Sequence, residues 1–301
     1  MRRLDPPQIT TREAFRMCIS AKISPPMETL LSKYEGRVVI AADAYEQACR
    51  TSTLHHMHPA AFGPLPLPQR KRDKDALIAM YERRMGPHHP GRPVYEEARN
   101  RKTKCPMCGV GAVRQVDHHM PKSIYPYLAA VPINLLPICS DCNFEKKDRA
   151  PTCYAEQILH PYFDDVDDDR WLRARLITCS ADGRAYQAKP LDRPASWLIE
   201  FYVDPPSSWD EKLTERVRYH FDTFKLARLY EEQVADDLPG IELSIEEAFL
   251  AGGAPDVRVH LEGLARSRAR RHKNSWMVAL YEALAGNDWF CSGGFRQVAA
   301  G

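Results

Sequence analysis

Two pairs of cysteines, each with two residues between its members, constrain this chain more than any other feature of its sequence. The pairs are Cys105 with Cys108, and Cys139 with Cys142. Thiolates at this spacing can bind one metal ion together, and two pairs complete a tetrahedral site with Zn–S distances of about 2.3 Å. The spacing predicts a structural Zn²⁺ site, with an iron–sulfur cluster as the alternative. Because four thiolates leave no open coordination position, this metal is not expected to be the catalyst.

The remaining cysteines and the lack of long apolar segments bear on the compartment. The chain has nine cysteines in 301 residues, an odd number, and its N-terminal segment is basic without the apolar core of a signal peptide. No run approaches the roughly 18 apolar residues that are needed to cross a bilayer. We therefore expect a protein of the reducing cytoplasm, without a disulfide framework and without a membrane partner.

The residues that could carry out chemistry lie between the cysteine pairs and just after the second pair. Asp117 and His118 are adjacent, Asn134 begins the sequence Asn-Leu-Leu-Pro, and Asn143 directly follows the last cysteine. An Asp–His pair by itself is most often an ordinary feature of a protein surface. With two CxxC pairs around it and an asparagine after the last cysteine, a catalytic role becomes the better interpretation.

This block resembles the ββα-metal core of the HNH endonucleases, in the subgroup whose core carries two CxxC pairs. The pattern of that subgroup is CxxC, then DHxxP, then NLxPxCxxCNxxK, and every element is present within residues 105–146. The resemblance says nothing about the flanks of this block. The third position of the family name is occupied by Asn143 instead of histidine, a form that is common in the family.

The resemblance implies a role for each residue of the pattern. Asp117 and Asn143 would bind a catalytic divalent cation through oxygen atoms, which suits Mg²⁺ or Mn²⁺. His118 would be the general base that takes a proton from the attacking water, and Asn134 would hold the loop that orients it. His119 is the alternative base. The family pattern, in which the base directly follows the aspartate, favours His118.

Contacts with nucleic acid are expected from local basic patches, because the net charge of the whole chain is only +2. Lys122 and Lys146 are the expected contacts beside the catalytic residues. Residues 69–104 hold eleven Lys and Arg against five Asp and Glu, and residues 266–273 form a second basic stretch. The resemblance implies a core that grips the backbone of a duplex, so the expected substrate is double-stranded DNA, bound in a salt-dependent manner.

The sequence predicts an α+β fold, in which a ββα-metal core with its four-cysteine zinc site is flanked by mainly helical regions. The expected segments are a helical region at 1–100, the zinc-bearing core at 101–165, a β-hairpin and strand segment at 166–204, and a helical region at 205–301. The hairpin signal is Asp182-Gly183 between alternating residues.

Finer expectations come from periodicity and from residues that break regular structure. Helices are expected at 11–23, 40–52, 73–85 and 94–99, a strand at 197–203, and irregular chain at 54–68. The acidic run at 164–169 is interpreted as a solvated turn.

The expected function is therefore that of a metal-dependent HNH endonuclease that hydrolyses phosphodiester bonds in DNA. The alternative is a zinc-stapled module that binds nucleic acid or protein without cutting. An HNH core between helical flanks is also similar to the effector nucleases of bacterial anti-phage defence systems, which often act with an ATPase or another sensor. The chain has no GxxxxGK[ST] loop, so any ATP-driven step is expected to come from a partner protein.

Overall fold

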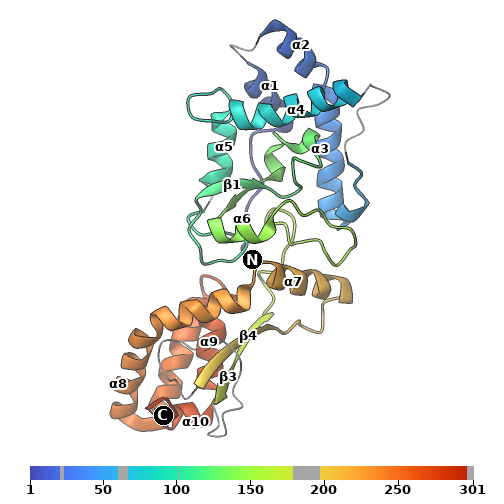
Figure 1. The fold of residues 1–301 in the computed structure, drawn as a ribbon. Helices are drawn as coiled ribbons and strands as arrows, with labels where there is room; N and C mark the ends of the chain where they lie inside the picture. Colours follow the sequence, from blue (N-terminus) through green and yellow to red (C-terminus); the bar gives the residue numbers. More distant parts are fainter. Residues whose placement is uncertain (21–23, 60–66, 101, 179–196, 297–301) are drawn as a thin grey trace. The chain divides into compact units, whose positions relative to one another are not determined.

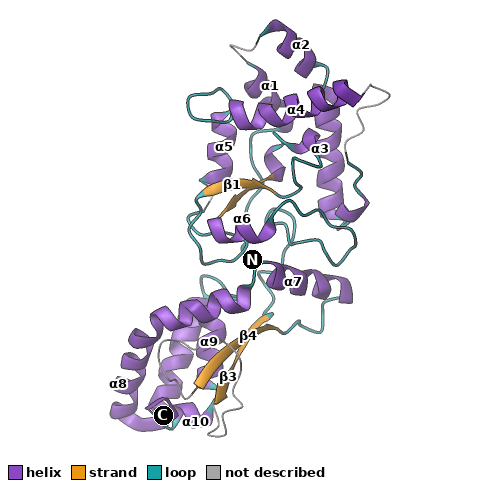
Figure 2. Cartoon of the chain, viewed as in Figure 1, coloured by secondary structure: helices purple, strands orange, loops and turns teal. Residues whose placement is uncertain are grey.

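The computed structural model describes residues 1–20, 24–59, 67–100, 102–178 and 197–296. The chain forms two compact units whose segments alternate along the sequence. Unit 1 contains Met1–Val166 and Glu215–Phe224, and unit 2 contains Asp167–Thr214 and the chain from Lys225 onward. Helices dominate both units, and each unit holds one small antiparallel sheet (Figures 1 and 2). This mixture agrees with the α+β class that the sequence predicts.

Helices make up most of the first part of unit 1. They are α1 (Thr11–Ile19), α2 (Pro25–Ser32), α3 (Glu35–Arg50), α4 (Leu67–Arg84) and α5 (Arg92–Arg99). A capping box starts α1: the Thr10 hydroxyl accepts a hydrogen bond from the Glu13 amide, and the Glu13 carboxylate accepts one from the Thr10 amide. Side chains from these helices and from the loop before β2 share one core, with Phe15, Tyr45 and Leu128 among its members.

One expectation for this part of the chain is wrong, and one helix was not expected. From the sequence, no helix is predicted at the position of α2. Residues 54–68 were expected to be irregular, but Leu54–His56 form a 3₁₀ turn and α4 begins at Leu67. Residues 60–66 lie outside the described chain. In both helices the prolines occupy the first turn. A backbone N–H at that position has no partner within the helix, so proline costs the helix no hydrogen bond there.

The middle of unit 1 is a strand–strand–helix sequence. Strand β1 (Gln115–His118) pairs antiparallel with β2 (Leu135–Ile138), so that Asp117 lies opposite Leu136 and His118 opposite Leu135. Helix α6 (Ser140–Lys146) follows β2 directly, and the thiol of Cys139 caps it by accepting a hydrogen bond from the Cys142 amide. All four residues of β2 are buried. This strand therefore fixes the position of β1 on one side and the start of α6 on the other.

Helix α7 (Glu211–Thr223) begins in unit 2 and ends in unit 1. Within unit 1, the guanidinium of Arg216 makes two hydrogen bonds to the carboxylate of Asp164, at 2.8 and 2.7 Å. Both side chains are buried, since only 3% of Arg216 and 10% of Asp164 is exposed. The acidic run at 164–169 is thus not simply a solvated turn. Its first residue is buried because a cation from a distant segment neutralises it.

Unit 2 pairs β3 (Leu172–Thr178) antiparallel with β4 (Trp197–Val203), which confirms the expected strand at 197–203. The expected turn at Asp182-Gly183 lies outside the described residues. Helices α8 (Leu226–Ala269), α9 (Trp276–Ala285) and α10 (Asp288–Cys291) complete the unit. Helix α8 is kinked at Gly252 and Gly253, whose backbone angles are not helical.

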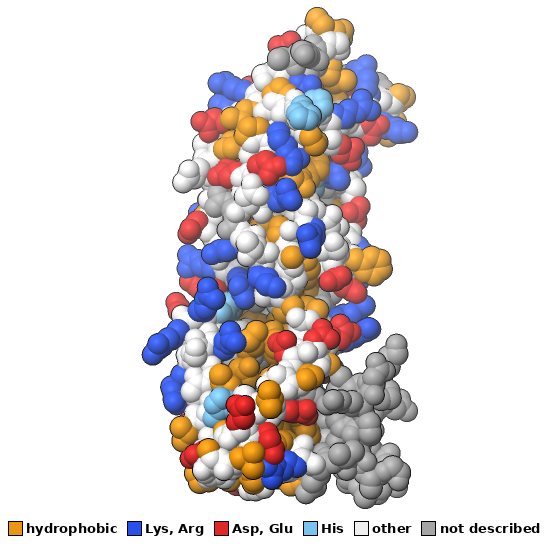
Figure 3. Space-filling view, turned by 90° about the vertical axis from the view of Figure 1, so that its left-hand side faces the viewer, with side chains coloured by type: hydrophobic (Ala, Val, Ile, Leu, Met, Phe, Trp, Pro, Cys, Tyr) orange, Lys and Arg blue, Asp and Glu red, His pale blue; other side chains and the backbone are white. Residues whose placement is uncertain are grey.

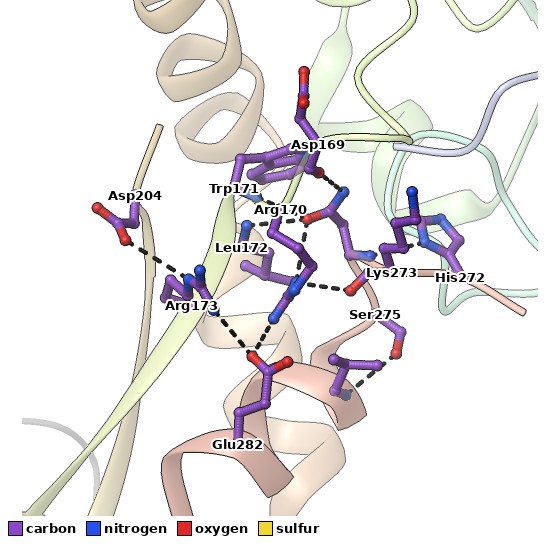
Figure 4. A network of polar contacts seen from close by, with 12 residues as sticks. Asp169, Arg170, Trp171, Leu172, Arg173, Asp204, His272, Lys273, Ser275 and Glu282 are labelled. Atoms are coloured by element: carbon purple, nitrogen blue, oxygen red, sulfur yellow. Dashed lines mark hydrogen bonds and ion pairs between the residues drawn. The ribbon is translucent and has the colours of Figure 1, made fainter. Parts of the chain in front are cut away.

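A network of polar contacts around Asn274 holds β3 to the turn before α9. The side-chain oxygen of Asn274 accepts hydrogen bonds from the Trp171 and Leu172 amides, at 3.0 and 3.2 Å, and its amide group donates to the carbonyl of Asp169. Beside it, Arg170 and Arg173 both reach the carboxylate of Glu282 on α9 (Figure 4). These contacts satisfy backbone groups at the buried start of β3, as buried polar groups require. Within the described part of the chain, no helix is long and apolar enough to cross a membrane.

Candidate metal centre and catalytic cluster

The four cysteines of the two CxxC pairs come together in unit 1. Their sulfur atoms all lie within 4.8 Å of one another, and all four side chains are buried. Two backbone amides point at this cluster: the Gly111 amide donates to the sulfur of Cys108, and the Cys142 amide to that of Cys139, each at 3.4 Å. A closed set of four sulfur donors with amide donors behind it fits a tetrahedral Zn²⁺ site.

The thiols of the cluster lie close enough to shift one another's pKa values. Hydrogen bonding with the thiol of Cys105 lowers the pKa of Cys108 and raises that of Cys142. A cation among the four sulfur atoms would favour the thiolate form of all of them.

Glycines allow the tight turn that brings the pairs together. Gly109 has a φ of +74°, a conformation that L side chains rarely adopt, and its amide donates to the Cys105 carbonyl at 2.8 Å. At Gly111, a Cβ atom would lie 2.7 Å from the Cβ of Cys139. Substitution at either glycine would therefore disturb the cysteine cluster directly.

Two segments far away in the sequence support the first cysteine pair. The imidazole of His220 on α7 bonds to the carbonyl of Met107 at 2.9 Å. From the N-terminal segment, the Arg2 amide donates to the Pro106 carbonyl and the Arg2 guanidinium to the Gly109 carbonyl. Burial lowers the pKa of His220 to about 3, so this imidazole is neutral and bonds as a donor to the carbonyl.

The two adjacent histidines at the end of β1 have different partners. His118 is 3% exposed; its Nε2 lies 2.8 Å from the Ala129 carbonyl, and its ring packs edge-on against Tyr81, with 4.4 Å between ring centroids. His119 lies over His160, with 4.3 Å between ring centroids, and its Nε2 is 3.4 Å from the Ile158 carbonyl. Each imidazole is therefore fixed in its own surroundings.

The hydrogen bond of His118 determines its tautomer. A carbonyl only accepts, so Nε2 must carry the proton and Nδ1 keeps its lone pair. Burial lowers the pKa of His118 to about 4, partly offset by the bond to Ala129. For His119, burial and the neighbouring His160 lower the pKa well below its usual value, and its Nδ1 is buried without a hydrogen-bond partner among the described residues.

Asn134 ties together the loop between the two strands. Its side-chain oxygen accepts a hydrogen bond from the Met120 amide at 2.8 Å, and its amide group donates to the carbonyls of Met120 and Leu128, at 3.0 and 3.1 Å. The side chain is fully buried. The bonds of Asn134 therefore fix Met120 and Leu128, the two ends of one stretch of this loop. Leu128 directly precedes Ala129, so the same bonds also position the carbonyl that holds the imidazole of His118.

Asp117 is paired with a lysine from α6. The ammonium of Lys146 lies 3.0 Å from Oδ2 of Asp117 and is only 3% exposed. The same Oδ2 is buried and accepts no hydrogen bond of good geometry within the described chain. Asn143 is half-buried and precedes Lys146 by three residues, so the two share the face of α6 that meets β1. The ion pair between Lys146 and Asp117 thus turns this face of α6 toward β1.

The two lysines expected to contact nucleic acid are both engaged within the protein. Lys146 is buried against Asp117, which differs from the surface position that such a contact needs. Lys122 is partly exposed, with its ammonium 3.7 Å from Glu82 and over the ring of Tyr81. Tyr81 was not singled out from the sequence. It lies on α4, more than thirty residues before His118, and nothing in its local sequence signals that contact.

Much of the charge in the two basic stretches is also paired. Arg84 donates to the carbonyls of Cys18 and Ser20, Arg266 pairs with Glu262, and Lys273 with Asp168. The face drawn in Figure 3 shows both basic and acidic side chains. The role of these stretches in binding nucleic acid stays a prediction.

Comparison with known proteins yields one informative similarity. The chain is similar to Protein ea31 of Escherichia phage lambda, with 30% identity over 161 residues, which cover 52% of this chain and 50% of that protein. The chain thus matches about half the length of this relative. No family model matches the chain, and no solved structure matches it.

Proposed function

We propose that this chain is a metal-dependent endonuclease of the HNH type, which hydrolyses phosphodiester bonds in double-stranded DNA. The observation that carries the proposal is the arrangement of His118 beside Asp117. The imidazole is held through Nε2 by a backbone carbonyl, which leaves the lone pair of Nδ1 to accept a proton. Asn134 and Tyr81 keep the imidazole in that orientation.

The donor atoms at this position suit a hard divalent cation. Asp117 offers a carboxylate, one oxygen of which is paired with the Lys146 ammonium at 3.0 Å, and Asn143 offers an amide oxygen from the same helix as that lysine. These two residues would hold Mg²⁺ or Mn²⁺, which prefer oxygen ligands. When bound, the ion would supply positive charge for the scissile phosphate and the leaving oxygen.

The residues of the chain account for the remaining steps. Nδ1 of His118 takes the proton from the attacking water, and the bond from Nε2 to Ala129 stabilises the imidazolium that forms. Lys146 holds the carboxylate of Asp117 in place through their ion pair. The four-cysteine site, with Zn²⁺ as the proposed metal, fixes α6 against the loop before β1 and takes no part in the chemistry.

The experiment that tests the proposal compares single histidine variants on supercoiled plasmid with added Mg²⁺ or Mn²⁺. His118→Ala is expected to lose cleavage by a factor of about 100 or more, since general-base catalysis contributes that much. His56→Ala, at an exposed histidine away from the cluster, serves as the matched control and should cut normally. Zinc content and circular dichroism must be unchanged in both. A folded His118→Ala protein that cuts like the wild type would exclude the proposed chemistry.

The alternative function is a zinc-stapled module that binds nucleic acid or protein without cutting. It is favoured by the ion pair between Lys146 and Asp117, which satisfies the charge of the carboxylate without a metal ion. A module of this kind would bind DNA equally well with or without Mg²⁺ and would leave plasmid intact. The plasmid assay therefore separates the two functions.

A cytoplasmic role in anti-phage defence, with an ATPase or another sensor as partner, is a further part of this proposal. Helix α8 exposes three large apolar side chains that a protein partner could cover: Leu243, Leu250 and Val259. Co-expression with neighbouring genes, followed by size-exclusion chromatography, tests this role. A chain that elutes alone with every neighbour and cuts DNA at full rate would argue against a partner.

A further inference from the structure

An exposed aromatic side chain lies directly beside the proposed catalytic cluster. Phe144 follows Asn143 on α6, and 70% of it is exposed. Single exposed apolar residues are common on protein surfaces and carry no meaning by themselves. The position matters here. Successive residues of a helix are about 100° apart, so Phe144 lies next to Asn143 around the axis of α6, on the exposed side of the helix and away from the buried Lys146.

The residue that ends α6 is held in a strained conformation. Lys147 has φ 53° and ψ −159°, a region that is essentially restricted to glycine. The conformation turns the Lys147 carbonyl toward the Lys146 ammonium, which donates to it at 3.4 Å. A glycine would make the same backbone contact without strain. The backbone contact therefore explains the conformation at position 147, but it does not explain why the residue there is a lysine.

The lysine side chain extends toward the phenylalanine. The ammonium of Lys147 lies 5.8 Å from the centroid of the Phe144 ring, within the range of a cation–π contact. Arg149, two residues further on, is also exposed. The acidic residue between them, Asp148, accepts a hydrogen bond from the Ser123 hydroxyl at 2.9 Å. The end of α6 thus presents an apolar ring and a cation side by side.

We infer that Phe144 and Lys147 form a contact for duplex DNA at the edge of the catalytic cluster. The inference rests on the proposed function and deepens it. The ammonium of Lys147 binds a backbone phosphate, and the ring of Phe144 packs against the sugar and base edges of the neighbouring step. Apolar side chains in such a position unstack bases partly, and they favour steps that deform easily. The protein therefore binds a duplex with a mismatch more tightly than a fully paired duplex.

The first test measures the anisotropy of short fluorescein-labelled duplexes, either fully paired or with one central mismatch. No divalent cation is added, so the probe is not cut and the four-cysteine site is undisturbed. Phe144→Ala is expected to lose affinity roughly tenfold and to lose the preference for the mismatch. Ile40→Ala removes an equally exposed apolar side chain from α3 and should change neither property.

The second test uses Lys147→Gly, which removes both the ammonium and the strain. We expect its melting temperature to rise while its affinity for the duplex falls, with the salt dependence of binding reduced by about one phosphate contact. A higher melting temperature with unchanged binding would show that Lys147 serves only the backbone, and would overturn the inference.

The outcomes also separate this inference from the proposed function. If the wild-type protein binds neither duplex at any salt concentration, the proposed function and the inference fail together. If the wild type binds and Phe144→Ala binds identically, the inference alone fails, and the exposed ring serves another purpose such as a protein contact. If the wild type cuts and binds but shows no preference for the mismatch, Phe144 does not unstack bases, and that part of the inference is wrong.

Discussion

His118 and His119 are adjacent in the sequence, and the structure gives them different surroundings. The bond from Nε2 to Ala129 leaves the lone pair of His118 on Nδ1, whereas His119 lies against His160 in the interior. Both imidazoles are neutral near pH 7, because burial disfavours the charged form. What distinguishes them is therefore the partners of each ring and not their protonation.

The pKa of His118 leads to a prediction for the pH dependence of cleavage. A general base must be neutral, and burial lowers the pKa of this imidazole from 6.5 to about 4. Cleavage should therefore persist as the pH falls from 7 to 5 and decline only as it approaches 4. The measurement is the initial rate of plasmid cleavage across this range, with DNA and metal saturating. A rate that halves near pH 6.5 would show that the base is a solvated imidazole.

At the level of single residues, the sequence predicted the members of the candidate site but not the residues that contact them. The motif placed Asp117, His118, Asn134 and Asn143 in one block, and the structure brings their segments together. Tyr81 and the Lys146–Asp117 ion pair could not be predicted, because they depend on how α4 and α6 pack around β1. A lysine after a CxxC pair suggests an exposed cation, and only the packed structure shows it buried.

At the level of elements, β1, β2 and α6 are too short to be stable alone. Each strand has four residues and α6 has seven, well below the length at which isolated helices persist in water. The cysteines supply what is missing: Cys139 caps α6, Cys142 lies in its first turn, and the other pair precedes β1. The resemblance of residues 105–146 to the HNH core is why this element order could be predicted, whereas no such resemblance covers α2.

Removal of one cysteine should therefore destabilise unit 1 strongly. We expect about one zinc per chain in the purified protein, and Cys142→Ser should lose the metal and several kcal/mol of unfolding free energy, because metal binding contributes to folding. Cys153→Ser is the matched control, since that thiol is exposed and lies outside the cluster. Elemental analysis and urea denaturation provide the measurements. Wild-type protein that is soluble and contains neither zinc nor iron would contradict the prediction.

At the level of the whole molecule, the chain leaves unit 1 after Val166 and returns to it at Glu215. The returning segment is not peripheral. Arg216 reaches Asp164, the Gln157 carbonyl and the Ser52 hydroxyl, and His220 bonds to Met107 between the first two cysteines. The helical pattern of the sequence predicts a helical region at 205–301, which includes this segment. It does not reveal which unit that helix completes, because this depends on contacts between distant segments.

The last prediction follows from the ion pair of Arg216 and Asp164. Removing one partner of a buried pair leaves the other charged and without compensation, which costs about 3–5 kcal/mol. Arg216→Ala should therefore lower the free energy of unfolding by an amount of that order. Arg218→Ala, an exposed arginine on the same helix, should change it by less than about 0.5 kcal/mol. Urea denaturation of the two full-length variants measures both values. Equal, small effects would mean that residues 215–224 are not an integral part of unit 1, whereas a large effect of Arg216→Ala alone means that this segment belongs to its folded core.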